Sequence, residues 1–312
     1  MFSAPIETVN QEIHFSPLKE KNIRLFLKRE DQIHPFVSGN KYRKLKYNIA
    51  EAKKLRKDTL LTFGGAFSNH IVAVAVAGKR AGFKTIGVIR GEELGVDLAK
   101  TIATNATLRE AHANGMQFHW VSRAAYRTKN TSRFLSSLET LFGDFYGIPE
   151  GGTNPLAVQG CEEILTSEDA RFNYVCAAVG TGGTLAGLIN AAQHHQKALG
   201  FPALKGDFLR NEITPFVTSS RKWDLIHDYH FGGYAKYNEA LISFINAFKE
   251  ETNIQLDPLY TGKMLFGIVD LIKKNYFSEN THVLAIHTGG LQGIDGFNRM
   301  LAKKNQKLIN LS

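Results

Sequence analysis

Cysteine is scarce in this chain, with only Cys161 and Cys176 among 312 residues. The two lie fifteen positions apart, so they form neither a CxxC pair nor a spacing typical of metal ligands. A disulfide-stabilised scaffold is therefore excluded. The pattern indicates two buried free thiols in a reducing compartment.

Long apolar runs are also missing. The longest, residues 71–77, is far shorter than the roughly 20 residues that a membrane-spanning helix needs. The first residues, MFSAPIETVNQEI, carry two glutamates and lack the apolar stretch of a secretory signal. The sequence therefore predicts a cytoplasmic protein that has no membrane partner.

Acidic residues are fewer than basic ones, 29 against 38, which gives a formal charge of +9. The excess is concentrated in residues 19–57, which hold thirteen Lys or Arg against four acids. A nucleic-acid footprint is one interpretation. No aromatic stacking pattern or nucleic-acid motif accompanies the charge, so we favour a solvated helix face beside a site that handles anions.

Short β-rich runs alternate with helical runs along the chain. The predicted strands are 23–28, 59–63, 84–89, 117–121, 174–179 and 282–287, and the predicted helices are 42–56, 69–80, 98–114 and 238–251. Several strands are almost continuously apolar, as expected when both faces of a parallel sheet are covered. This order predicts an α/β protein with a largely parallel sheet.

Glycine and proline are concentrated in residues 146–153, YGIPEGGT, which indicates a hinge or domain return. We therefore expect a smaller inserted α/β domain at 50–150. A larger domain would be made from residues 1–49 and 151–312.

The strongest local motif is AVGTGGTLAG at residues 178–187, where a buried strand runs into a glycine-rich turn and then a helix. Backbone N–H groups of such a turn, together with the helix N-terminus, bind phosphate. No Lys follows the glycines as in a Walker loop, and Leu185 stands where GxGxxG requires glycine. An ordinary strand–helix turn is the alternative interpretation.

Four further motifs stand at loops next to predicted elements: SGNKYRK at 38–44, GGAFSNH at 64–70, DPLYTGK at 257–263 and HTGG at 287–290. Lys41 would need a lowered pKa to react as a free amine. The positive charges of Arg43, Lys44 and Lys46 could lower it. Ser68 or Asn69 could instead simply cap the helix that follows. A loop at the C-terminal end of a parallel strand is also where α/β proteins bind ligands.

Taken together, these five motifs resemble the D-cysteine desulfhydrase and 1-aminocyclopropane-1-carboxylate (ACC) deaminase family. The resemblance covers nearly the whole chain, from LKRED at 27–31 to HTGG. It implies the tryptophan synthase β-like fold, fold type II, with two open parallel-sheet α/β domains and pyridoxal 5′-phosphate between them. It also implies a homodimer that acts on a small amino acid.

The resemblance assigns roles to individual residues. Lys41 would hold the cofactor as a Schiff base, Asn69 would bind its phenolic oxygen, and Thr288 would face its pyridine nitrogen. Its phosphate would lie on the loop formed by Gly180, Thr181, Gly182, Gly183 and Thr184. The expected catalytic residues are Lys41, Ser68, Tyr234 and Tyr260, and the expected substrate contacts are Ser68, Asn69, His70 and Tyr260.

The choice of reaction depends on two threonines. ACC deaminases of this family typically carry Glu and Leu where this chain has Thr261 and Thr288. A carboxylate beside the pyridine nitrogen would keep it protonated, whereas a hydroxyl leaves a weaker electron sink. ACC has no α-hydrogen, but D-cysteine has one and a good leaving group. We therefore expect a lyase that converts D-cysteine to pyruvate, sulfide and ammonia.

Other interpretations remain open. One is an ACC deaminase, which hydrolyses ACC to 2-oxobutyrate and ammonia, or a lyase for another β-substituted amino acid. Another is a cofactor-binding protein without turnover. Phe67, Val72 and Ala235 depart from the usual family pattern and bear on the substrate more than on the cofactor. His194 with His195, and His227 with His230, lack the acids or thiols of a metal site, so we expect no metal.

Overall fold

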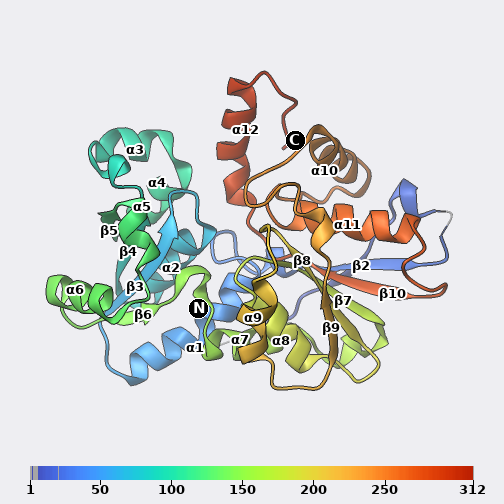
Figure 1. Cartoon of the computed structure of the whole chain (residues 1–312), viewed down its shortest axis with the longest axis horizontal. Coiled ribbons are helices and arrows are strands. Elements are labelled where there is room, and N and C mark those ends of the chain that lie inside the picture. The colour runs from blue at the N-terminus through green and yellow to red at the C-terminus, as the bar shows by residue number, and fades with distance from the viewer. Residues whose placement is uncertain (1, 3–5, 20, 312) are drawn as a thin grey trace.

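The computed structural model describes residues 2, 6–19 and 21–311, which form two separate sheets (Figure 1). The smaller sheet has the order β5-β4-β3-β6, and all its strands are parallel. These strands are β3 (Thr59–Gly65), β4 (Lys84–Arg90), β5 (Met116–Val121) and β6 (Tyr146–Ile148).

The larger sheet has the order β1-β2-β10-β7-β8-β9, in which only the edge pair β1–β2 is antiparallel. Its strands come from both ends of the chain: β1 (Asn10–Glu12), β2 (Arg24–Lys28), β7 (Tyr174–Val179), β8 (Lys197–Pro202), β9 (Lys222–Leu225) and β10 (His282–Ile286). The prediction of an α/β fold with parallel sheets is confirmed.

Helices cover both sheets (Figure 1). Beside the smaller sheet lie α2 (Asn69–Ala81), α3 (Leu98–Thr104), α4 (Ala106–Ala113), α5 (Arg123–Arg127) and α6 (Ser132–Phe142). The others are α1 (Asn40–Lys54), α7 (Pro155–Glu162), α8 (Gly183–Ala191), α9 (Leu209–Ile213), α10 (Glu239–Thr252), α11 (Thr261–Lys273) and α12 (Ile294–Lys303). No described helix is long and apolar enough to cross a membrane.

Apolar burial explains why the central strands were recognisable. Every residue of β7 after Tyr174 is buried, and so is every residue of β10 after His282. Val175, Leu284 and Ile286 pack with Phe172 and Leu188 on one side of the larger sheet. A strand with helices on both faces has no polar face, so its sequence shows a continuous apolar run.

One local prediction is wrong. The helix predicted over 98–114 is two helices, because the side chain of Asn105 accepts a hydrogen bond from the N–H of Leu108 and starts α4. Strands β1, β6, β8 and β9 were not predicted. The segment predicted as a hinge or domain return begins with β6, which pairs with β3 through Leu60–Tyr146 and Thr62–Ile148. The domain boundaries at 50 and 150 remain a prediction.

The two sheets turn the carboxyl ends of their strands toward a common region. The loop after β3 contains residues 66–68, the loop after β7 contains 180–182, and the loop after β10 contains 287–290. Together with the start of α1, they bring four segments far apart in sequence around one cavity. This is the place where open parallel sheets bind ligands.

Candidate active site

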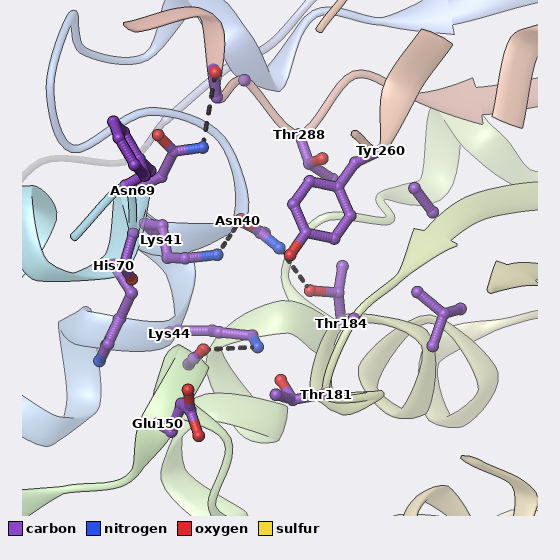
Figure 2. Close-up of a pocket in the computed structure, with 18 of the residues that line it drawn as sticks. Asn40, Lys41, Lys44, Asn69, His70, Glu150, Thr181, Thr184, Tyr260 and Thr288 are labelled. Atoms are coloured by element: carbon purple, nitrogen blue, oxygen red, sulfur yellow. Dashed lines mark hydrogen bonds between the residues drawn. The ribbon is translucent and has the colours of Figure 1, made fainter. Parts of the chain in front are cut away.

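A cavity of about 440 Å³ lies between the two sheets and is lined by residues from all five sequence motifs (Figure 2). Each predicted site residue except Gly183 is among its lining residues: Lys41, Ser68, Asn69, His70, Gly180, Thr181, Gly182, Thr184, Tyr234, Tyr260 and Thr288. Gly183 is the first residue of α8, directly behind this wall.

Lys41 stands in the first turn of α1 with its amine turned into the cavity (Figure 2). Its Nζ donates to Oδ1 of Asn40 at 3.1 Å, and Nδ2 of Asn40 donates to Oγ1 of Thr184 at 2.8 Å. Burial of the amine, together with the nearby charge of Lys44, lowers the pKa of Lys41 to about 7. A free amine at neutral pH is what lysine chemistry requires.

The backbone before Lys41 requires glycine. Gly39 has φ +56°, and a Cβ there would lie 2.1 Å from the carbonyl oxygen of Thr288. The start of α1 therefore packs directly on the loop after β10. This close approach brings two of the motifs into one wall of the cavity.

The GTGGT loop joins β7 to α8 and leaves room only for backbone. Gly182 has φ +83°, and a Cβ there would lie 2.4 Å from Cγ1 of Ile213. A Cβ on Gly183 would lie 2.7 Å from Oγ1 of Thr153. No side chain caps the start of α8, so its first N–H groups are available to an anion.

Lys44 is a cavity residue whose direct role the sequence analysis missed. Its Nζ donates to the carbonyl oxygen of Gly151 at 3.0 Å (Figure 2). It also donates to Oγ1 of Thr153 at 3.0 Å. Oγ1 of Thr153 is 2.6 Å from Oγ1 of Thr181 in the GTGGT loop. Burial lowers the pKa of Lys44. The sequence feature that indicates this position is the spacing of Lys44 from Lys41, since residues three apart share a helix face.

The loop before α2 offers polar groups that the protein itself leaves unused. Ser68 occupies the N-cap position but makes no capping hydrogen bond, so the interpretation of it as a simple cap is wrong. Nδ2 of Asn69 donates to the carbonyl oxygen of Gly290 at 3.4 Å, while its buried Oδ1 has no partner among the described residues. A ligand in the cavity could satisfy both side chains.

His70 is buried, and its Nε2 lies 2.8 Å from Oγ1 of Thr62. The Thr62 hydroxyl donates its proton to the carbonyl oxygen of Ile148, so Nε2 of His70 is the donor in this pair. Burial and the charges of Lys41 and Lys44 hold the pKa of His70 well below its usual value. The neutral ring is therefore fixed on β3, and its contact with a substrate remains a prediction.

Two tyrosines form the opposite side of the cavity. The rings of Tyr234 and Tyr260 lie 6.3 Å apart between centroids. Burial raises the pKa of Tyr234 and raises that of Tyr260 well above its usual value. Both phenols are therefore neutral at neutral pH and can donate protons.

Lys263 fixes the loop that carries Tyr234. Its Nζ donates to the carbonyl oxygens of His230 and Gly233 at 2.9 and 2.8 Å. Tyr260 directly precedes the first turn of α11, and Lys263 lies within that turn. The start of one helix therefore positions both tyrosines. The DPLYTGK motif contained this lysine, but nothing in the sequence linked it to the Tyr234 loop.

Thr261 and Thr288 are not equivalent. Thr288 lines the cavity. Thr261 is fully buried and donates from Oγ1 to Oδ2 of Asp257 at 2.6 Å. The hydroxyl of Thr261 is therefore held within the loop at the start of α11, and its relation to the cofactor remains a prediction. The Asp257 carboxylate also accepts three backbone N–H groups, from Leu259, Tyr260 and Thr261, each at 2.8 Å.

These groups fit pyridoxal 5′-phosphate. Lys44 lies beside the glycine cradle and the free N–H groups at the start of α8, which suits a phosphate dianion. The amine of Lys41 suits an aldehyde, and the unpartnered Asn69 Oδ1 suits a polar ring substituent. Thr288 offers a neutral hydroxyl rather than a carboxylate.

Residues 9–289 match the family model described as pyridoxal-phosphate dependent enzyme. The chain is 29% identical to a putative ACC deaminase of Pyrococcus horikoshii, over 88% of this chain and 87% of that protein. It is 30% identical to the mitochondrial bifunctional D-cysteine desulfhydrase/ACC deaminase of Arabidopsis thaliana, over 86% and 73% of the two chains. A D-cysteine desulfhydrase of Salmonella schwarzengrund is 26% identical, over 85% and 86%.

Solved structures show the same fold. A crystal structure of an ACC deaminase homologue superposes with a TM-score of 0.80 at 27% identity, covering 96% of this chain and 94% of that one. A threonine deaminase of Solanum lycopersicum superposes with a TM-score of 0.63 at 17% identity, covering 91% and 80%. At that identity the likeness shows the fold alone.

Proposed function

Because the chain belongs to the pyridoxal-phosphate dependent enzyme family, on the branch of ACC deaminases and D-cysteine desulfhydrases, we propose that it is a D-cysteine desulfhydrase. It would convert D-cysteine to pyruvate, sulfide and ammonia by β-elimination. The cofactor would be held by Lys41 and Asn69, by the 180–184 loop with Lys44 at the phosphate, and by Thr288.

The observation that carries this choice is the pair Thr261 and Thr288, where ACC deaminases of the family typically carry Glu and Leu. The hydroxyl of Thr288 lines the cavity, and Thr261, at the start of α11, provides no carboxylate. The nearby Asp257 carboxylate is occupied by four hydrogen bonds within its own loop. Without an acid at the ring nitrogen, chemistry that starts by removing an α-proton is favoured over ring opening of a substrate that has none.

The bound cofactor would supply an electron sink for the substrate's α-carbon. Lys41, with a pKa of about 7, is suited to accept the α-proton at neutral pH. The carbon–sulfur bond then breaks, and sulfide leaves with the electron pair. The neutral phenol of Tyr260 would donate the proton that the sulfur takes up. The 2-aminoacrylate left behind reacts with water to give pyruvate and ammonia.

The directions of the pKa shifts assign different proton-transfer roles to Lys41 and Tyr260. Tyr260, one of the expected catalytic residues, has a pKa well above its usual value and is therefore suited as a proton donor. Lys41 is the better base of the two. Ser68, at the uncapped start of α2, would bind the substrate carboxylate.

ACC deaminase is the second candidate, favoured by the names of the Pyrococcus and Arabidopsis relatives. The deciding experiment measures sulfide from D-cysteine and 2-oxobutyrate from ACC in parallel, with Lys41→Ala as the inactive control. We expect sulfide without appreciable 2-oxobutyrate. Robust 2-oxobutyrate without sulfide would overturn the desulfhydrase proposal.

We also propose a homodimer in the cytoplasm, as the family resemblance implies. Light scattering coupled to size-exclusion chromatography measures the mass directly. A mass near 34.7 kDa, that of one chain, would contradict the dimer.

A further inference from the structure

Arg90 is a charged cavity residue that none of the sequence motifs contains. It is the last residue of β4 and pairs with Gly65 of β3 in the parallel ladder. A Cβ built on Gly65 would lie 3.5 Å from Nη2 of Arg90. The guanidinium therefore lies beside the start of the loop that carries Ser68, and it lines the same cavity as Lys41.

The guanidinium of Arg90 lies over the aromatic ring of Tyr126. Its central carbon lies 5.6 Å from the ring centroid of Tyr126, and Nζ of Lys129 lies 4.9 Å from the same centroid. Tyr126 is buried in α5, so it is a firm support. Contact with an aromatic face orients an arginine without neutralising it.

Arg90 has no acidic partner among the residues that the structure describes. The acid on the same side of the cavity, Glu150, pairs with Lys129 at 3.2 Å. Lys44 lies at the end that suits the cofactor, where a phosphate would balance its charge, and the amine of Lys41 would be taken up by the cofactor's aldehyde. Arg90 is therefore a cavity cation that neither the protein nor the cofactor neutralises.

Its position indicates which part of a substrate it meets. The α-carbon of an amino acid has to come within reach of Lys41, whose amine is desolvated inside the cavity. Arg90 is exposed and belongs to the rim of the smaller sheet. Because the proposed function assigns the α-carboxylate to Ser68, the group left to meet Arg90 is the end of the substrate's side chain.

We propose that Arg90 selects amino-acid substrates whose short side chain ends in an anion, such as a thiolate or a carboxylate. The inference rests on the proposed function and specifies its substrate class. A guanidinium offers paired N–H donors to such a group. In the elimination from D-cysteine, Arg90 would face the sulfur and stabilise the negative charge that it gains as the carbon–sulfur bond breaks.

The test compares binding of D-aspartate and D-asparagine to the holoenzyme by titration calorimetry. The two probes have nearly the same shape and differ in charge at the end of the side chain. We expect the wild-type protein to prefer D-aspartate by about tenfold, as for a charge-assisted hydrogen bond. Arg90→Gln should abolish the preference by weakening D-aspartate alone, and Arg90→Lys should keep part of it.

Arg127→Gln is the matched control, because Arg127 ends the same short helix as Tyr126 but does not line the cavity. It should keep the wild-type preference, and cofactor absorbance should be equal in all variants. The proposal is overturned if the wild-type protein shows no preference, or if Arg90→Gln weakens both probes equally or neither. A lack of sulfide release would count against the desulfhydrase while leaving this binding result intact.

Discussion

The two sides of the cavity differ in how they are built. The side proposed for the cofactor consists of the start of α1, the GTGGT loop and Lys44, and it is fixed by tight backbone packing and partly buried hydrogen bonds. The substrate side presents exposed side chains, with Phe67 58% and Tyr234 43% exposed. Binding of the cofactor therefore depends on the packing of the fold, whereas the choice of substrate depends on side chains that can change without disturbing it.

The loop that carries Tyr234 contains non-glycine residues in the left-handed conformation. The loop that carries Tyr234 has positive φ at four of the residues from 231 to 235, including the non-glycine residues Phe231 and Ala235, at +55° and +56°. A left-handed conformation costs a non-glycine residue about 1–2 kcal/mol. Ala235, which departs from the family's glycine, therefore adopts a strained conformation in a loop that Lys263 fixes at His230 and Gly233.

The other two departures from the family pattern, Val72 and Phe67, differ in whether they line the cavity. Val72 is fully buried in α2 and lies outside the cavity, so it belongs to the core of the smaller domain. Phe67 lines the cavity and extends toward α12, where a Cβ on Gly296 would lie 3.6 Å from its ring. Of the two, only Phe67 can contact a substrate.

The largest expected effect is on the cofactor side. Lys41→Ala should lose the visible absorption band of the bound cofactor and all measurable sulfide release, because no other amine replaces it in the same geometry. Lys53→Ala, an exposed lysine on the same helix, is the control and should keep both. Borohydride reduction that labels a lysine other than Lys41 would show the assignment to be wrong.

The glycine cradle gives the next largest effect. Gly183→Val should weaken cofactor affinity by about 10- to 100-fold, because its side chain would overlap Thr153 and overpacking of this kind costs about 1–3 kcal/mol. Thr181→Ser, which keeps its hydroxyl on an exposed residue of the same loop, should change affinity little. Equal affinities in a cofactor titration would argue against a backbone cradle.

On the substrate side, Tyr260→Phe should lower turnover by about 100-fold while the cofactor spectrum stays nearly unchanged. The change removes a proton donor and no cofactor anchor. Tyr276→Phe, an exposed tyrosine beyond the end of α11, is the control. Loss of the visible band in Tyr260→Phe would mean that this ring belongs to the cofactor side instead.

The pH dependence of cofactor capture separates the two sides further. Burial lowers the pKa of Lys41 to about 7, so the reactive free amine is lost as the pH falls below 7 and is fully present above 8. The rate at which the apoprotein takes up the cofactor should rise about tenfold per pH unit below 7 and then level off. Stopped-flow absorbance measures it, and a rate that keeps rising to pH 10 would contradict a desolvated lysine.

The smallest effect concerns the support of the Tyr234 loop. Lys263→Met removes two hydrogen bonds to backbone carbonyls, so KM for D-cysteine should rise several-fold while cofactor affinity is kept. Lys273→Met, at the exposed end of the same helix, provides the comparison. A parallel loss of cofactor would show that Lys263 stabilises the whole cavity rather than this loop.

The sequence by itself predicted the parts that local chemistry dictates. The central strands of both sheets were recognisable because buried parallel strands are continuously apolar. The GTGGT loop was recognisable because only glycine allows its backbone conformation and close contacts. Short edge strands such as β1 (Asn10–Glu12) and β9 (Lys222–Leu225) were missed, since a few residues of mixed polarity carry no periodic signal.

Only the tertiary structure decided which side chains face the cavity. Thr261 follows Tyr260 in sequence, but Tyr260 is the non-helical residue before α11 and Thr261 is its first helical residue, whose hydroxyl donates to Asp257. Arg90 belongs to no motif, and Glu150 lies in the segment predicted as a hinge or domain return. Both reach the cavity because parallel pairing places the ends of β4 and β6 beside β3. Residues brought together by sheet pairing are distant in the chain, and a single sequence does not encode that proximity in any local pattern.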